Sequence, residues 1–133
     1  MVRVRRLLGT SVRPAQAAWA EYLWVPHRGA MRRIDVADIT WIDAEGDYIR
    51  IWTLQAQVLL NETITRLIER LDPGAFVRLR RSSVVRITKI QAVRHVGLGS
   101  WEAQLFDGDH IRIGPTYLKT VKDLLRDGNR RPD

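Results

Sequence analysis

Few residues in this chain have the types and spacing that enzymatic chemistry requires. The three histidines, His27, His95 and His110, lie far apart and lack the short spacings of metal ligands. The absence of cysteine excludes thiolate metal sites and cysteine nucleophiles. Neither the Gly-x-Ser-x-Gly elbow of hydrolases nor the Gly-x-x-x-x-Gly-Lys loop of nucleotide-binding proteins occurs. The sequence therefore predicts a protein that is not an enzyme and that uses no metal ion or cofactor.

One carboxylate cluster comes close to a metal site. Asp43, Glu45 and Asp47 alternate along the chain, and carboxylate oxygens at this spacing could hold Mg²⁺ in a nuclease-like centre. Gly46 lies among them, which is typical of a tight turn that joins two strands. Because no other acidic residues complete a two-metal centre, we interpret the cluster as an acidic turn.

Cationic chemistry is the stronger feature of the sequence. The chain carries 22 Lys and Arg against 15 Asp and Glu, which gives a net charge of +7. A domain with this balance is typically a partner of a polyanion or of an anionic membrane surface. Residues 76–96 contain no acid and six bases, which are Arg78, Arg80, Arg81, Arg86, Lys89 and Arg94.

Apolar residues alternate with these bases, so the basic stretch is anchored to a core. The alternation lapses at Arg80-Arg81-Ser82-Ser83, which predicts an irregular point in the chain. Such a point can present two guanidiniums and two hydroxyls to phosphates or base edges. The charge pattern alone also permits a solvated surface that binds nothing.

Short strands must position this basic segment. The middle helix is predicted from apolar residues at helical spacing over 64–71, with Asn61 or Thr63 as its cap, and a last helix begins near Pro115 and ends at Gly128. The expected fold is mainly β, with several short antiparallel sheets, a short middle helix and a C-terminal helix. Alternating β-branched and aromatic residues predict strands near 34–36, 39–42, 48–54, 58–60, 90–96, 101–106 and 111–113.

One domain accounts for a chain of 133 residues. We place it at 29–127, between an N-terminal extension at 1–28 and a tail at 128–133. The extension is expected to be largely irregular, with a short helix at 14–21, and too short to hold a sensor domain. No apolar run reaches the roughly 20 residues of a membrane helix and no signal-peptide core is present, so we expect a cytoplasmic protein.

The basic segment resembles a known signature. Residues 76–86 read Phe-Val-Arg-Leu-Arg-Arg-Ser-Ser-Val-Val-Arg, which is similar to LytTR-type DNA-binding domains, where a base is followed by His-Arg-Ser and then by Val-Asn. The resemblance covers residues 29–127 and depends on several motifs in the right order. These further motifs are the strand–turn–strand at 39–49, the short helix at 63–71, the Leu-x-Asp-Gly hairpin at 105–108 and the last helix at 117–125.

The resemblance implies a β fold that binds promoter DNA through loops, commonly in pairs on direct repeats. It implies three contact regions, at residues 45–50, 80–82 and 114–116. This sequence departs from the family pattern with Arg80 for the usual His, Arg86 for the usual Asn, and Gly114-Pro115 for the usual Ser-Arg pair. The residues expected to contact DNA are Tyr48, Arg50, Arg78, Arg80, Arg81, Ser82, Ser83, Arg86, Lys89, Arg112, Thr116 and Lys119.

We expect these contacts to divide into base readout and positioning. Arg81 is predicted to reach a base edge in the major groove, while Arg80, Ser82, Arg86 and Lys89 hold phosphates. The expected partner is double-stranded promoter DNA, with a homodimer on DNA and a separate signalling protein as further expected partners. No membrane partner is expected.

Two alternatives stay open from the residues alone. The first is an RNA- or ribosome-associated basic module, in which Tyr48, Trp52 and Trp101 stack bases, although core packing is the ordinary role of Trp52. The second is a partner-binding domain that another protein regulates. The aromatic residues that could anchor such a partner are Trp19, Tyr22 and Trp24.

Overall fold

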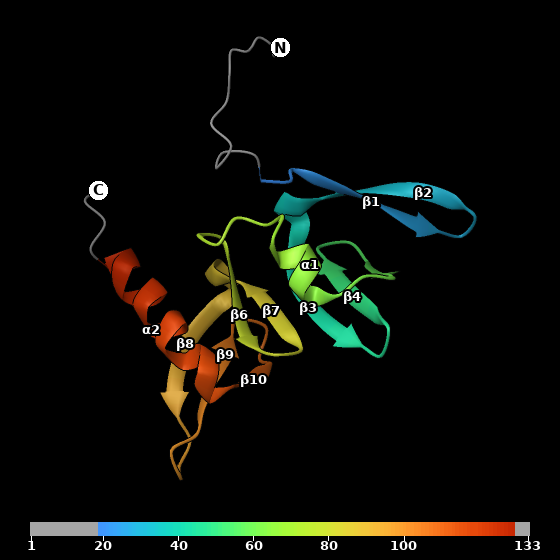
Figure 1. Cartoon of the computed structure of the whole chain (residues 1–133). Helices are drawn as coiled ribbons and strands as arrows, with labels where there is room; N and C mark the ends of the chain where they lie inside the picture. Colours follow the sequence, from blue (N-terminus) through green and yellow to red (C-terminus); the bar gives the residue numbers. More distant parts are fainter. Residues whose placement is uncertain (1–18, 130–133) are drawn as a thin grey trace.

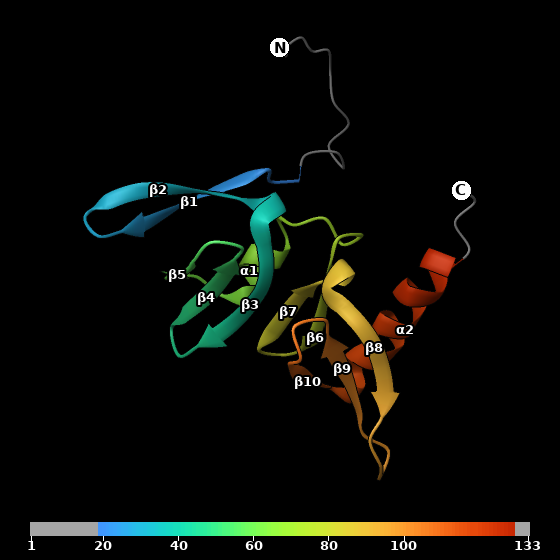
Figure 2. The same ribbon diagram turned by 180° about the vertical axis from the view of Figure 1, so that it is seen from behind.

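The structure is a computed structural model and describes residues 19–129. These residues form three antiparallel sheets and two α-helices (Figures 1 and 2). The helices are α1 (Ile64–Ile68) and α2 (Pro115–Asn129), with 3-10 turns η2 (Val36–Asp38) and η3 (Ile87–Lys89). The strands are β1 (Tyr22–His27), β2 (Ala30–Asp35), β3 (Ile39–Glu45), β4 (Tyr48–Thr53), β5 (Gln57–Leu60), β6 (Phe76–Arg80), β7 (Ser83–Arg86), β8 (Ile90–His95), β9 (Trp101–Leu105) and β10 (His110–Ile113).

The strand pairing confirms the mainly β fold with antiparallel sheets, a short middle helix and a C-terminal helix. A two-stranded sheet joins β1 to β2, and a three-stranded sheet has the order β10-β9-β8. The central sheet has five strands in the order β5-β4-β3-β7-β6. Every pairing along the described chain is antiparallel, as expected for strands that follow one another through short turns.

The five-stranded sheet lies between two hydrophobic cores. On one face, Ile49 and Ile51 of β4 pack with α1 and the β1–β2 hairpin. On the other face, Val77 and Val85 pack with the three-stranded sheet and α2. Figure 1 shows the hairpin at one end of the molecule and the three-stranded sheet with α2 at the other. Strand β7 is consequently buried on both of its faces, because each core covers one of them.

The N-terminal hairpin corrects one prediction. The sequence predicts irregular backbone up to residue 28, but Tyr22–His27 forms β1 and pairs with β2. Leu23 and Val25 are buried in the first core, whereas Trp24 between them is 56% exposed. The outward-facing aromatic residues obscure this alternation in the sequence, because they are as hydrophobic as the inward-facing ones. Most of the helix predicted at 14–21 lies outside the described residues, and residues 19–21 are not helical.

The two helices follow the predicted signals closely. Thr63 caps α1, and its hydroxyl oxygen accepts a hydrogen bond from the amide of Arg66 at 3.1 Å. The helix ends at Ile68, although Leu71 of the predicted stripe is still buried in the first core. Pro115 begins α2, as suits a residue without an amide proton. Neither helix of residues 19–129 has the length and apolar character that a transmembrane crossing requires.

Replacing Leu23 by alanine is expected to lower the free energy of unfolding by about 2–4 kcal/mol, because a buried side chain leaves a cavity in the first core. The matched control is Trp24→Ala in the same strand, which removes only an edge contact with Tyr22 and is expected to change stability by about 1 kcal/mol or less. Urea denaturation followed by circular dichroism measures both values. Equal effects of the two substitutions would show that the hairpin is not part of the cooperative core.

Candidate nucleic-acid interface

The basic turn between β6 and β7 is held by backbone hydrogen bonds on both sides. The amide of Ala44, in β3, donates to the carbonyl of Ser82 at 2.8 Å. The amide of Gly114, just before α2, donates to the carbonyl of Leu79 at 2.8 Å. The β3–β4 turn, the β6–β7 turn and the start of α2 therefore lie together, on the lower side of the molecule in Figures 1 and 2. These are the three contact regions that the resemblance implies.

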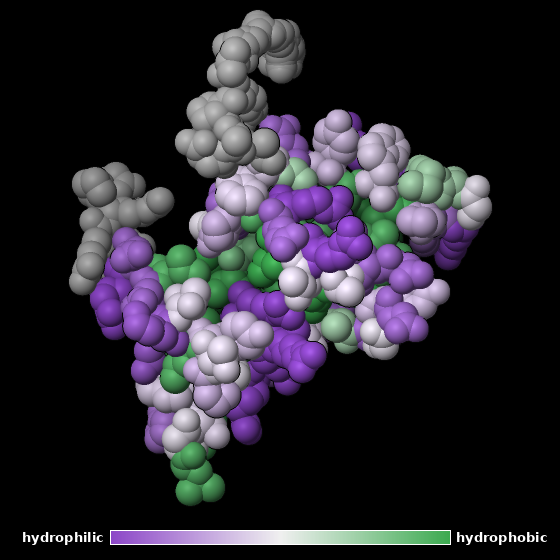
Figure 3. Space-filling model, viewed as in Figure 1, coloured by the Kyte–Doolittle hydropathy of each residue, from purple (hydrophilic) through white to green (hydrophobic). Residues whose placement is uncertain are grey.

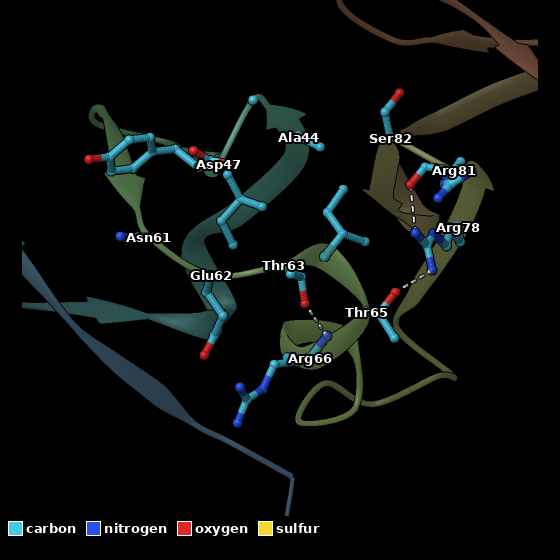
Figure 4. Close-up of a pocket in the computed structure, with 14 residues that line it drawn as sticks. Ala44, Asp47, Asn61, Glu62, Thr63, Thr65, Arg66, Arg78, Arg81 and Ser82 are labelled. Atoms are coloured by element: carbon cyan, nitrogen blue, oxygen red, sulfur yellow. Dashed lines mark hydrogen bonds between the residues drawn. The ribbon is translucent and has the colours of Figure 1, made fainter.

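A groove of about 1070 Å³ runs between the β3–β4 turn, the start of α1 and the β6–β7 turn (Figure 4). Figure 3 shows hydrophilic side chains gathered over α1 and the β6–β7 hairpin on this face. Four of the expected contact residues line the groove: Tyr48, Arg78, Arg81 and Ser82.

The start of α1 is a wall of the groove that sequence reasoning missed. Thr63, Thr65 and Arg66 line this wall. The only feature of the sequence that marks this wall is the capping residue Thr63, followed three residues later by the base Arg66. Nothing in that pattern indicates that α1 packs beside the turns of β3 and β7.

Arg78 is a brace of the turn. Its Nη2 donates to the carbonyl of Arg81 at 2.6 Å, and its Nη1 donates to the hydroxyl of Thr65 at 3.3 Å (Figure 4). Its guanidinium also lies 5.6 Å from the ring centroid of Tyr117 in α2. Arg78 thus links the turn to both helices through one N–H of each terminal nitrogen, while its buried Nε has no hydrogen-bond partner among the described residues.

Arg81 differs from Arg78 in its exposure and in its hydrogen bonding. It is exposed at the turn, and its guanidinium makes no hydrogen bond or ion pair with any residue of the described chain, 19–129. Ser82 beside it is half-buried and lines the groove. Hydrogen bonds to the backbone carbonyls of Arg81 and Ser82 fix the backbone of the turn. The side chain of Arg81 is therefore available to a ligand while the backbone stays in place.

Arg80 and Ser83 face the other side of the turn. The hydroxyl of Ser83 is buried, donates to Oδ1 of Asp43 at 2.9 Å and accepts from Nε of Arg80 at 3.2 Å. Ser83 is 0% exposed, so it cannot touch a ligand directly, and we do not keep it among the DNA contacts. Arg80 remains exposed.

Arg86 is held by contacts within the domain. Its Nε donates to the carbonyl of Ile39 at 2.7 Å, its Nη2 donates to the carbonyl of Val36, and its guanidinium stacks 4.5 Å from the ring centroid of Phe76. Burial lowers the pKa of Arg86, and the nearby charge of Asp38 opposes that effect. These contacts tie β7 to η2 and to the start of β3 through Nε and Nη2, and the phosphate contact that the sequence predicts for Arg86 stays a prediction.

Arg50 is already paired. Its Nε and Nη2 donate to the two carboxylate oxygens of Glu45, at 3.0 and 2.5 Å, and its Nη1 donates to Gln57. The hydrogen bond to Arg50 lowers the pKa of Glu45, and the same bond raises the pKa of Arg50. The pair therefore stabilises the fold above the ordinary glutamate pKa, and its contribution is lost as the pH falls through the lowered value. Arg50 braces the β3–β4 hairpin.

The acidic cluster does not converge. Asp43 accepts hydrogen bonds from Trp41 and Ser83, Glu45 pairs with Arg50, and Asp47 is exposed at the groove. Within residues 19–129, no three His, Cys, Asp or Glu side chains gather as metal ligands would.

The remaining expected contacts lie outside the groove, and Lys89 in η3 follows the end of β7 that is opposite the basic turn. Arg112 is exposed on β10 opposite Glu102, and Lys119 pairs with Asp123 at 2.8 Å. Lys89 lines a separate small pocket of about 110 Å³ with Trp41 and Phe106. None of these lysines and arginines lies in the groove of Figure 4.

Thr116 lies at the start of α2, next to the basic turn. A Cβ at Gly114 would come within 3.3 Å of the Tyr117 ring and 3.7 Å of the Arg80 Cβ. Glycine at this position therefore leaves room for the Tyr117 ring, while the distance to Arg80 in β6 is that of an ordinary van der Waals contact. The backbone hydrogen bond from Gly114 to Leu79 keeps this segment beside the turn although Gly114-Pro115 replaces the family's usual pair.

A mainly β domain that exposes arginines at a fixed turn belongs to the class of nucleic-acid-binding modules. The model of the LytTr DNA-binding domain matches residues 29–126. The chain therefore belongs to the LytTR family of DNA-binding domains, which are parts of transcriptional regulators, and the resemblance noted in the sequence is confirmed.

Individual relatives agree with this assignment. The chain is 27% identical over 120 residues to the CO-responsive transcriptional regulator RcoM of Rhodospirillum rubrum. This match covers 88% of this chain and 50% of RcoM. It is 25% identical over 92 residues to the sensory transduction protein LytT of Bacillus subtilis, covering 69% of this chain and 38% of that protein. The chain thus spans half or less of the length of these curated relatives.

A solved structure supports the fold. The LytTr DNA-binding domain of a response regulator from Bacillus cereus superposes with a TM-score of 0.70 at 12% sequence identity. The match covers 80% of this chain and 97% of that domain.

Arg86→Ala is expected to lower the free energy of unfolding by about 1–3 kcal/mol, because two carbonyl groups lose a charged donor. Thermal and urea denaturation measure the loss, and Arg81→Ala, which removes an exposed side chain without a hydrogen bond, is the control with unchanged stability. If Arg86→Ala kept full stability but lowered the salt dependence of DNA binding, Arg86 would be a phosphate contact after all.

Proposed function

We propose that this domain binds specific duplex DNA sequences by inserting its turns into the grooves, and that it serves as the output part of a bacterial transcriptional regulator. The observation that carries the proposal is the Arg81 guanidinium, exposed and without a partner in the described chain, at a turn fixed by two backbone hydrogen bonds. A fixed backbone with an available guanidinium suits base recognition, because only the side chain, and not the backbone, has to be ordered on binding.

In this proposal Arg81 reaches a base edge in the major groove, where guanine O6 and N7 accept both arms of a guanidinium. Ser82 and Tyr48, which line the same groove, face the sugar-phosphate backbone. Arg112, Thr116 and Lys119, together with Lys89 at the other end of β7, contribute to the attraction of phosphates. In this proposal Arg50, Arg78 and Arg86 hold neighbouring side chains and backbone carbonyls in place through hydrogen bonds.

Regulation and assembly follow from the relatives as further parts of the proposal. RcoM is named a CO-responsive regulator and LytT a sensory transduction protein, and each is about twice the length matched here or longer. A signal received by another domain or another protein would then control DNA binding, within the cytoplasm. Binding to direct repeats places two copies side by side on DNA.

The RNA-binding alternative receives no support from the aromatic rings. Trp52 stacks on Trp41 with ring centroids 6.0 Å apart, and the Lys122 ammonium lies 3.9 Å from the ring centroid of Trp101. Only Tyr48 of the three candidate rings lines the groove. A row of free rings, as base stacking requires, is therefore not formed by these residues.

Selection of bound duplexes from a random pool tests the proposal directly. The expected result is a short motif that recurs as a direct repeat, and duplex DNA that displaces single-stranded RNA in competition. Recovery of unrelated sequences would reduce the function to non-specific DNA binding, and displacement of duplex by RNA would overturn it.

Arg81→Ala is expected to weaken binding to the selected duplex by about 1–3 kcal/mol and to relax the preference at one base pair. Titration against duplexes that each carry one base-pair change measures both effects. Arg66→Ala, which removes another exposed arginine of the same groove, is expected to weaken binding to all duplexes equally. Equal weakening by Arg81→Ala would instead assign Arg81 to the phosphates.

A further inference from the structure

A polar row crosses four strands of the central sheet at the edge of the basic turn. Arg80 in β6 pairs with Ser83 in β7, Ser83 pairs with Asp43 in β3, and Asp43 pairs with Arg50 in β4. Cross-strand partners point to the same face of a sheet. The single carboxylate of Asp43 therefore lies between two arginines.

Hydrogen bonds connect this row into a directed chain. Trp41 Nε1 donates to Asp43 Oδ1 at 2.8 Å, and Ser83 Oγ donates to the same oxygen at 2.9 Å. Because the Ser83 proton is committed to Asp43, its oxygen can only accept, and it accepts from Arg80 Nε at 3.2 Å. Asp43 thus fixes Ser83, and Ser83 fixes the inner nitrogen of Arg80.

This anchoring orients the outer part of Arg80. The two terminal nitrogens, Nη1 and Nη2, make no hydrogen bond within residues 19–129, and the residue is exposed at the turn. An arginine held at Nε presents those nitrogens as a planar fork of set direction, which matches the paired acceptors of guanine. Arg81, by contrast, has no such anchor.

We propose that Arg80 is a second specificity-determining residue that reads a base, and that Ser83 and Asp43 are positioning residues that set the direction of its guanidinium. The proposal rests on the proposed function, since it assumes a duplex with a preferred sequence. It replaces the phosphate contact predicted for Arg80 from the sequence. It also gives a role to the buried Ser83 and to Asp43, which the groove does not use.

A double-mutant cycle tests the proposal with wild type, Arg80→Ala, Ser83→Ala and the double variant. Ser83→Ala is expected to weaken binding to the selected duplex by about three- to tenfold, the range of one lost hydrogen bond. It is also expected to lower discrimination at one base pair while binding to an unrelated duplex changes less than about twofold. In the Arg80→Ala background, Ser83→Ala is expected to have no further effect, because it acts through Arg80.

Matched controls separate positioning from loss of structure. Ser83→Ala is expected to keep its effect in the Arg81→Ala background, because Arg81 is not bonded to Ser83. Asp43→Asn retains an oxygen that accepts both hydrogen bonds and is expected to preserve most of the discrimination, whereas Asp43→Ala loses it. If Ser83→Ala does not fold, the two Asp43 variants decide the question.

The outcomes distinguish a failure of the positioning role from a failure of the proposed sequence-specific DNA binding. If Ser83→Ala weakened all duplexes equally, or if its effect persisted in the Arg80→Ala background, the positioning role would be wrong while sequence-specific binding stood. If wild type selected no motif at all, the proposed function itself would fail, and the readout role of Arg80 with it.

Discussion

The burial of β7 on both faces is the constraint on which the rest of the structure depends. Two cores meet across this strand, one with α1 and the hairpin and one with α2 and the three-stranded sheet. Val84 and Val85 face opposite cores and are both buried. A strand covered in this way meets solvent only at its ends, so the turn that precedes it is where polar groups must emerge. The fold thereby exposes the Arg81-Ser82 turn, where we propose that DNA is read.

Four arginines lie within nine residues, and each makes different contacts. The position of each arginine in the strand register decides which partners its side chain meets. Arg78 braces the turn, Arg80 is anchored by Ser83, Arg81 is free of side-chain bonds, and Arg86 binds two backbone carbonyls. An irregular register between Arg78 and Arg80 separates the first two, since it breaks the strict alternation of sides. The sequence shows the lapse in alternation, but not the partners that a displaced side chain then meets.

Sequence reasoning succeeded where the information is local and failed where it is tertiary. The strand 48–53, the Thr63 cap and the start of α2 at Pro115 were all predictable from alternation, capping chemistry and proline preference. Strand β1 was not, because Leu23 and Val25 are recognisable as inward-facing only once the core exists. The α1 wall of the groove depends likewise on how separate elements pack. The central turn was found because its charge pattern is local.

Charge counting from the sequence overstates what the surface offers to DNA. Arg50 donates to both carboxylate oxygens of Glu45, so its charge is already balanced within the β3–β4 hairpin. A phosphate could recruit Arg50 only by leaving that carboxylate unpaired. Arg86 is committed to carbonyls in the same way. Since the salt dependence of binding counts only the phosphates that are neutralised, it reflects the exposed bases rather than the whole basic segment. Part of the arginine content thus determines the shape of the interface rather than its charge.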